Sequence, residues 1–590
     1  MFTRRHFATT VAVLAMLFTA VAARAQGVRE LPADALVVIK INNLQALSGK
    51  IAAMAKQMKL DELVPPLADP LGALKQQLNI REGLNARGDL IIGIYEPAGT
   101  GEPDRVILVP VTDFKAFMGN MKDVKEEGGI SSFTWPGESE PTFAVARGGF
   151  AAVSTRKELL TKGAGGVEPT GFAAKHLASA DAAAYVDIKR IAAKALPELK
   201  KHRPEIMKQL EAGMPGVDPK FRPVMKVLVS QALNVAEGAL ETTQSAVMAV
   251  NIGKNGINTV LAAEFAPEGY MGRMLASFKQ TDAPLLTGLP SSRKLLLYGG
   301  MVIDSTNMLR LLEDFMGPIA KELEAAGPDG KAILDLIDSI KQALKVTDSM
   351  AFAYVAPTGQ IGQQSALQAV SLMRGDAAKL AGIYKNQMQG VANLMRLLPQ
   401  APGTSVDVQV KPGAKTVDGV SLDQMVMQFK FDANTPEGAA AAQRINLMYG
   451  PGGWTGYMGA ADARTYLLVM GGGDELLGQV VAAAKKNDEG VAAANNVKAV
   501  DAQLPAKRIG VWYLAVDNIA SMIMQYMAAF GMPAQVKIAP DLSPIAFSLA
   551  AEGSVLRMDM VLPADLMENI IAVVVQFAAA PKAAPRPAQP

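Results

Sequence analysis

The chain contains no cysteine and only three histidines among its 590 residues. Without cysteine it can form no disulfide and carry no lipid anchor on a cysteine. It has 58 Lys and Arg against 56 Asp and Glu, which gives a formal charge of +2, and it has no run of basic residues. Because nucleic-acid binding requires a concentrated positive surface, we discount that class of protein.

Long hydrophobic runs are also missing downstream of the N-terminus. The longest apolar stretch, Ile570 to Ala580, is interrupted by Gln576. It is shorter than the roughly 20 residues that a membrane-spanning helix needs. We therefore expect no transmembrane segment in the mature chain and a soluble protein.

The N-terminus has the three parts of a cleavable signal peptide, which we place at residues 1–25. Arg4 and Arg5 form the positive end, residues 8–22 are apolar, and Ala23-Arg24-Ala25 is an A-x-A cleavage site. This pattern predicts bacterial export and a periplasmic or secreted location.

The export route stays open between two alternatives. Residues 3–7, Thr-Arg-Arg-His-Phe, resemble a twin-arginine signal, whose pathway exports folded proteins. The usual continuation of that signal is Leu-Lys, whereas Ala8-Thr9 follow here. A general secretory signal explains the same residues.

Composition predicts folded domains, since 50% of the residues are hydrophobic and 19% are charged. The length exceeds that of one ordinary core. We place a first α+β lobe at residues 26–286 and a second at 287–578. The Pro- and Ala-rich residues 579–590 are predicted to be a disordered tail.

The two lobes share an order of sequence elements, which predicts an internal duplication. An alternative is that any chain with alternating strands and helices produces such matches. We also interpret residues 204–236 as extra helical sequence in the first lobe, and residues 406–429 as an extra hairpin in the second. The matching pairs are Leu31-Pro32 with Leu289-Pro290, 88–95 with 347–354, 150–160 with 467–477, 185–187 with 513–517, and hairpin turns at 254–256 and 551–553.

Hydrophobic periodicity predicts the fold class. Apolar residues at intervals of three and four indicate amphipathic helices within 44–58, 308–319, 380–394 and 519–530. Asn and Asp residues at the strand-to-helix junctions suit helix N-caps. Short Gly-containing turns join alternating strands. We expect an α+β protein in which each lobe has an antiparallel-rich mixed sheet with helices packed on one face.

Residues that carry chemistry are scarce. His176 and His202 are the histidines left after the signal, and no G-x-S-x-G, H-E-x-x-H or EF-hand pattern accompanies them. The glycines at 471–473 lack the third glycine of a dinucleotide fingerprint. We predict no catalytic, cofactor-binding or metal-binding residue and no cofactor. An enzyme is the less favoured interpretation.

One aromatic residue is a candidate ligand contact. Trp454 lies in the Gly-rich segment 452–456, which we interpret as a loop. An aromatic side chain on a loop can contact a ligand, and it can equally fill a hydrophobic gap. Both interpretations stay open.

The segment Leu31-Pro-Ala-Asp-Ala-Leu-Val-Val38 resembles the start of large exported bacterial proteins known only as domains of unknown function. The resemblance covers this motif and the general plan of the chain. It implies no activity and no site residue.

Three functions follow as hypotheses. The first is a non-enzymatic envelope protein, a binding or scaffolding module whose partner is an envelope protein or a small apolar ligand. The second is an exported hydrolase that acts through carboxylates, which requires a pocket with converging Asp or Glu side chains. The third is a periplasmic carrier of a lipid-like ligand, which requires an enclosed apolar cavity.

Overall fold

The computed structural model of the chain describes residues 27–97, 99, 101–134, 140–212, 219–359, 365–397, 404–431, 435–450, 453–487, 489–529 and 537–579. The predicted signal peptide and the tail beyond residue 579 lie outside the described residues. The chain folds into two compact units. Unit 1 comprises Met1–Glu198, Ala239–Arg273 and Gly553–Met558, and unit 2 comprises Leu199–Gly238, Met274–Glu552 and Asp559–Pro590.

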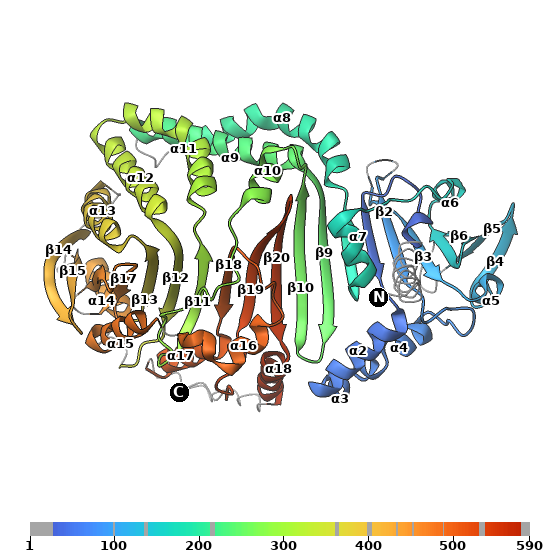
Figure 1. Cartoon of the computed structure of the whole chain (residues 1–590). Helices are drawn as coiled ribbons and strands as arrows, with labels where there is room; N and C mark the ends of the chain where they lie inside the picture. The colour runs from blue at the N-terminus through green and yellow to red at the C-terminus, as the bar shows by residue number, and fades with distance from the viewer. Residues whose placement is uncertain are drawn as a thin grey trace, which may run out of the picture. The chain divides into compact units, whose positions relative to one another are not determined.

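Unit 1 is built on one antiparallel sheet (Figure 1). Its strands follow the order β10-β9-β8-β1-β2-β3-β7-β6-β5-β4. The strand bounds are β1 Val37–Ile41, β2 Leu90–Tyr95, β3 Asp104–Pro110, β4 Lys122–Glu127, β5 Ile130–Thr134, β6 Thr142–Arg147, β7 Phe150–Ser154, β8 Ala182–Val186, β9 Thr243–Gly253 and β10 Gly256–Phe265. The helices that belong to it are α2 Leu44–Gln57, α3 Leu60–Leu63, α4 Pro70–Gln77, α5 Phe114–Met118, α6 Lys157–Thr161, α7 Gly171–Ser179 and the first turns of α8 Ile188–Ala212.

Unit 2 contains a second series of antiparallel strands, although the first residues of its last strand, β20, fall in unit 1. The order of this series is β20-β19-β18-β11-β12-β13-β17-β16-β15-β14. The strand bounds are β11 Leu295–Val302, β12 Thr347–Val355, β13 Gln368–Gly375, β14 Thr404–Val417, β15 Val420–Phe431, β16 Trp454–Ala460, β17 Thr465–Met470, β18 Gly510–Leu514, β19 Ile545–Glu552 and β20 Val555–Pro563. Its longer helices are α9 Arg222–Thr242, α11 Ser305–Ala325, α12 Pro328–Val346, α13 Ala377–Leu397, α14 Pro436–Tyr449, α15 Gly473–Lys486, α16 Asn495–Asp501, α17 Val516–Ala529 and α18 Ala564–Ala579.

The two sheets have the same strand order, since each strand of unit 1 has its counterpart ten strands later along the chain. The hairpin β14–β15, which we interpreted as an addition to the second lobe, occupies the same place in this order as β4–β5. The sequence alone missed β4–β5 because all six residues of β4 are exposed and carry no apolar alternation. A common origin of the two halves by duplication stays a prediction.

The cores follow from alternation along the strands. In β1 and β2, Val38 and Ile91 are fully buried while their neighbours are half-buried. In unit 2, Leu372 and Leu467 pack with helix α15 on one face of the sheet. Met373 and Tyr466, which are their sequence neighbours, pack with α13 on the opposite face. Helices therefore cover both faces of β13 and β17.

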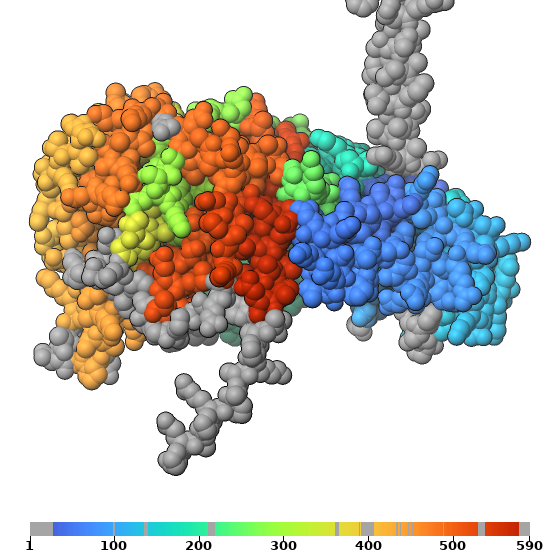
Figure 2. Space-filling model, turned by 90° about the horizontal axis from the view of Figure 1, so that it is seen from below, coloured from blue at the N-terminus to red at the C-terminus, as the bar shows by residue number. Residues whose placement is uncertain are grey.

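Folding in unit 2 brings distant segments together. The central strand β11 pairs with β12 on one side and with β18, more than two hundred residues later in the numbering, on the other. Figure 2 shows that segments distant in the sequence lie side by side on the surface of this unit, since a green segment lies between orange and red ones.

The fold class predicted from the sequence is confirmed as α+β with antiparallel sheets. The four amphipathic patterns coincide with α2, α11, α13 and α17, except that Met58 follows the end of α2 and Phe530 lies outside the described residues. Both Gly-containing turns join antiparallel hairpins. Across the described ranges, no helix combines the length and the apolar character needed to cross a membrane. The lobe boundary predicted at residue 286 lies in the same β10–β11 connection as the observed break after Arg273.

Candidate functional site

A charged hollow of about 420 Å³ opens at one end of the unit 1 sheet. This volume falls in the range of small-ligand sites. Its walls come from the segment before β1, the end of β2, helix α6 and the start of α8. The lining residues are Asp34, Leu36, Tyr95, Glu96, Pro97, Arg156, Leu159, Lys162, Arg190 and Lys194.

Local hydrogen bonds fix these walls. Asp187 accepts a hydrogen bond from the backbone N–H of Arg190 at 2.9 Å and so caps α8. Arg147 in β6 donates to the carbonyl oxygens of Glu30 at 3.0 Å, Leu160 at 2.6 Å and Lys162 at 2.9 Å. Since these carbonyls belong to the segment before β1 and to the end of α6, Arg147 holds two walls of the hollow together.

Two of the basic side chains in the hollow form loose, solvent-exposed ion pairs with Asp34. Lys162 Nζ and Arg190 Nη1 both lie 3.5 Å from the carboxylate of Asp34. The Asp34 side chain is 66% exposed, and those of Lys162 and Arg190 are 53% and 40% exposed. Pairs this open contribute about 0–1 kcal/mol each. Water or a ligand oxygen can therefore replace Asp34 at little cost.

The remaining two cations sit closer to their own partners. Arg156 pairs with Asp104, and Lys194 pairs with Glu96. Four basic side chains thus converge from α6 and α8, while Asp34 and Glu96 are the acids that line the hollow.

The floor of the hollow is apolar and rigid. Tyr95 is 3% exposed and donates its hydroxyl to the carbonyl oxygen of Pro32 at 3.2 Å. Burial raises the pKa of Tyr95 far above its usual value, and Arg147 offsets part of this rise. The phenol is therefore neutral in the physiological range. With Leu36 and Leu159, it offers a ligand an apolar surface below the charges.

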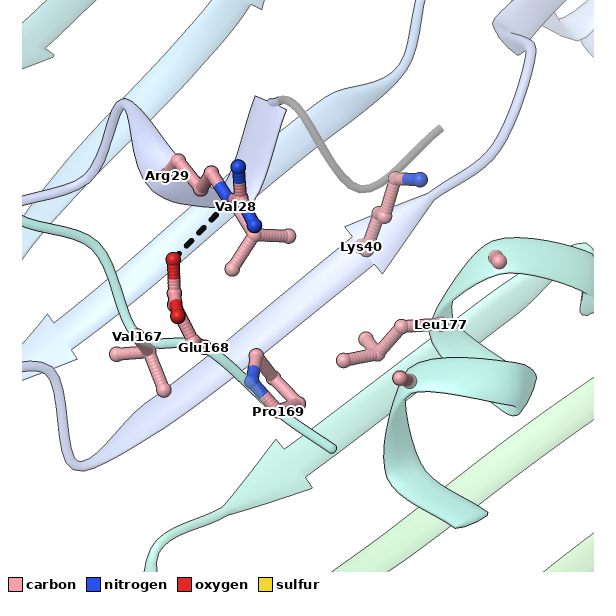
Figure 3. A pocket seen from close by; sticks show the side chains of 9 residues that line it. Val28, Arg29, Lys40, Val167, Glu168, Pro169 and Leu177 are labelled. Atoms are coloured by element: carbon pink, nitrogen blue, oxygen red, sulfur yellow. Dashed lines mark ion pairs between the residues drawn. The ribbon is translucent and has the colours of Figure 1, made fainter. Parts of the chain in front are cut away.

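A second, smaller cavity of unit 1 contains a buried lysine (Figure 3). Lys40 in β1 is fully buried and pairs with Asp89 at 3.0 Å. The other oxygen of Asp89 accepts the backbone N–H of Asn43 at 2.9 Å. This network ties the end of β1 to the cap of α2. The pair Arg29–Glu168, 3.2 Å apart and exposed, lines the same cavity. A volume of about 60 Å³ suits water better than a ligand.

In unit 2, a buried arginine lies in the segment before the first strand. Arg293 stands two residues before β11, and the pairing of Leu31 with Leu289 matches it with Ala35, one residue after Asp34. Its guanidinium donates to Gln479 of α15 at 2.7 Å and to Thr358, beyond β12, at 2.9 Å. It also pairs with Glu475 at 3.1 Å, and its side chain is only 3% exposed.

The structure places Trp454 in a strand, where we expected a loop. It is the first residue of β16, and its indole N–H donates to the carbonyl oxygen of Leu367 at 3.2 Å. Its ring centroid lies 5.5 Å from that of Tyr449, which stacks on Phe429. It also packs against the hydrophobic cluster beneath α13. A ligand contact at Trp454 stays a prediction.

The two histidines lie apart from the hollow. His176 is buried in α7 with its ring 4.3 Å from that of Phe172, and His202 lies in α8. Within the described parts of the chain, no three His, Asp or Glu side chains gather as a metal site would require.

Comparisons with known proteins place the chain in no family. No family model matches it. No curated protein matches it either. One solved structure, crystal form III of the protein TP0453, matches over 50% of this chain and 98% of its own, with 9% identity and a TM-score of 0.20.

Sequence reasoning missed the hollow, because its charged residues are scattered. Asp34 and Lys162 are 128 positions apart. The one usable signal is that basic residues stand in the first turns after two strands, Arg156 after β7 and Arg190 after β8.

Proposed function

We propose that this protein is an exported, non-enzymatic binding module that uses the charged hollow of unit 1 to bind a small organic anion. The observation that carries the proposal is the convergence of four basic side chains above an apolar floor, in a space of about 420 Å³. The sequence pattern of residues 1–25 supports the export. A ligand with carboxylate or phosphate oxygens and an apolar part suits both the cations and the floor.

Binding follows from the weakness of the internal pairs. Lys162 and Arg190 share the carboxylate of Asp34 at 3.5 Å, beyond good hydrogen-bond distance. An anion that replaces Asp34 makes shorter, charge-assisted hydrogen bonds to both cations. Asp34 is free to turn toward water, since most of its side chain is exposed.

The test is a calorimetric titration with citrate at low salt. We expect the double variant Lys162→Gln, Arg190→Gln to bind at least about tenfold more weakly than the wild type, since each charged hydrogen bond contributes roughly 1.5–3 kcal/mol. Lys189→Gln is the matched control, because Lys189 is an exposed lysine beside Arg190 on α8 that does not line the hollow. Equal binding by all three proteins would refute the proposal.

Native mass spectrometry of gently purified protein gives an independent check. We expect an acidic small molecule to be retained by the wild type and lost from the double variant. Retention of a neutral lipid or a peptide by both proteins would instead favour the other hypotheses for this envelope protein.

A further inference from the structure

We propose that unit 2 contains a second binding site, in which Asp517 and Tyr298 bind the ammonium group of a small amine. The site is a cavity of about 140 Å³ between β11, the start of α17, the segment around α16 and the loop before β19. It is independent of the hollow of unit 1, and it has the opposite charge preference. Its polar lining residues are Arg293, Tyr298, Asn496, Asp517, Asn518 and Asp541.

Asp517 is a buried carboxylate with little internal compensation. It is 5% exposed, and its Oδ2 accepts the backbone N–H of Leu542 at a long 3.3 Å. Among the described residues, no Lys, Arg or His forms an ion pair with it. The first turn of α17 stabilises this carboxylate in part, since a helix N-terminus favours negative charge. A buried carboxylate still has a desolvation cost unless a cation or several donors approach it.

Tyr298 supplies the second, independent observation. It is 3% exposed, and its ring stacks on that of Tyr513 with centroids 5.2 Å apart. The hydroxyl of Tyr513 donates to Asp501. By contrast, within the part of the chain that the structure describes, the Tyr298 hydroxyl makes no hydrogen bond to protein. It is not one of the fully buried unpaired polar atoms, so it is accessible from the cavity that Tyr298 lines.

Tyr298 and Asp517 lie at the same cavity. Both line the cavity, and the charge of Asp517 adds to the effect of burial in raising the pKa of Tyr298. The phenol therefore stays neutral and presents an oxygen that accepts a hydrogen bond. A carboxylate and a neutral hydroxyl side by side suit an ammonium group, which donates three hydrogen bonds and brings the missing positive charge.

The single basic side chain of the lining does not compete for this role. Arg293 is engaged by Glu475, Gln479 and Thr358. The rest of the wall is held in place by hydrogen bonds between its own residues, because the Asn518 side chain donates to the carbonyl oxygen of Leu295 at 2.9 Å. Asn496 donates to that of Leu542 at 3.1 Å. The cavity admits only a small group.

Ethanolamine is a suitable probe, because it carries an ammonium group and a hydroxyl group within this volume. We expect saturable binding to the full chain by ligand-observed NMR. Asp517→Asn should weaken this binding by at least about tenfold, and Tyr298→Phe by about three- to tenfold. Tyr298→Phe keeps the ring stack and so tests the site even if the aspartate variant folds poorly.

Asp565→Asn is the matched control, since Asp565 also accepts a backbone N–H, that of Ser543 at 2.8 Å, without lining the cavity. It should bind ethanolamine like the wild type. The proposal is overturned if the wild type does not bind ethanolamine, if it binds acetate equally well, or if neither cavity variant weakens binding. Loss of citrate binding to unit 1 would leave this result unaffected.

Discussion

Unit 1 and unit 2 use the same strand order, yet they treat one corresponding place differently. Before β1, the exposed Asp34 faces cations across an open hollow. Before β11, the Arg293 side chain is only 3% exposed, and it donates hydrogen bonds to Gln479 of α15 and to Thr358, beyond β12. A long side chain with several partners fills the space in unit 2. In unit 1, the shorter side chain of Asp34 does not fill the hollow, which stays open to solvent. The two units thus share a strand order but differ in the side chains that lie before the first strand.

The largest effect that we predict concerns the first strand of each sheet. Unit 1 buries Lys40 in β1, with Asp89 as its carboxylate partner, whereas β11 has Gly299 and Gly300 at its centre. Asp89→Ala should lower the stability of unit 1 by about 3 kcal/mol, because removing one partner of a buried pair leaves a charge in the core. Hydrogen exchange of the β1 and β2 amides measures this loss.

The double variant Lys40→Met, Asp89→Ala checks the cause of that loss. It should recover most of the stability, because a methionine of similar length fills the space without a charge. No recovery would mean that the Asp89–Asn43 hydrogen bond, not the ion pair, carries the effect.

The second prediction compares the buried Arg293 of unit 2 with the exposed Asp34 of unit 1. Arg293→Ala should destabilise unit 2 by about 2 kcal/mol, since it removes a buried, multiply bonded side chain. Asp34→Ala should change the stability of unit 1 by less than about 0.5 kcal/mol, because its ion pairs are exposed. Urea denaturation followed by hydrogen exchange in each unit compares them. Equal losses would contradict the distinction.

The third prediction separates the two units by pH. Asp304 caps α11 by accepting the backbone N–H of Asn307, whereas the neutral Asn43 caps α2. Burial raises the pKa of Asp304, but hydrogen bonds from Asn307 and from the backbone of Lys279 outweigh burial and hold the pKa below its usual 3.8. The ionised cap therefore stabilises α11 above about pH 4, and this stability is lost as the pH falls through the lowered pKa.

Asp304→Ala should cost about 1 kcal/mol at neutral pH, and the difference from the wild type should shrink below pH 4. Thermal unfolding between pH 3 and pH 7 measures it. Asp304→Asn keeps one acceptor oxygen for the backbone N–H of Asn307 but loses the bonds that Lys279 and the Asn307 side chain donate to Oδ2, so it should be partly destabilised and show no pH dependence. A difference that stays constant with pH would assign the effect to packing.

The smallest effect is the salt dependence of binding in the hollow. Because the four cations of the hollow are 33% to 65% exposed, raising the salt from about 20 mM to about 200 mM should weaken citrate binding several-fold. Ethanolamine binding in the cavity of unit 2 should change less, because Asp517 is only 5% exposed. Titrations of both probes at the two salt concentrations compare the units. Equal salt slopes would remove the contrast between exposed cations and a buried carboxylate.

Local patterns predicted much of the fold. The helix α2 and the hairpin β9–β10 follow from apolar spacing and from the turn at Gly256, which depend on neighbouring residues only. The strand order could not be predicted, because strand pairing depends on contacts between distant parts of the chain. The strand β4 could not be predicted because its exposed residues show no apolar alternation. The α+β class follows from the local patterns of apolar residues and turns.

The candidate sites were not predictable in the same way. Asp34, Lys162 and Arg190 meet only because β1, α6 and α8 meet, and none of them stands in a recognisable motif. Asp517 was noticed as a junction residue with a structural role, and its burial beside Tyr298 depends on the loop before β19. We expected Trp454 to lie in a loop because glycines flank it. Its pairing with Met427 places it in strand β16 instead. The hydrolase and lipid-carrier hypotheses stay predictions.

The most direct test of the account is a crystal structure of the full chain soaked in selenate, a tetrahedral anion with an anomalous signal. We predict selenate in the hollow of unit 1, in contact with Lys162 and Arg190, and none at the place that Arg293 fills in unit 2. An empty hollow, or selenate bound equally at Arg293, would contradict the claim that unit 1 holds an open anion site which unit 2 has closed.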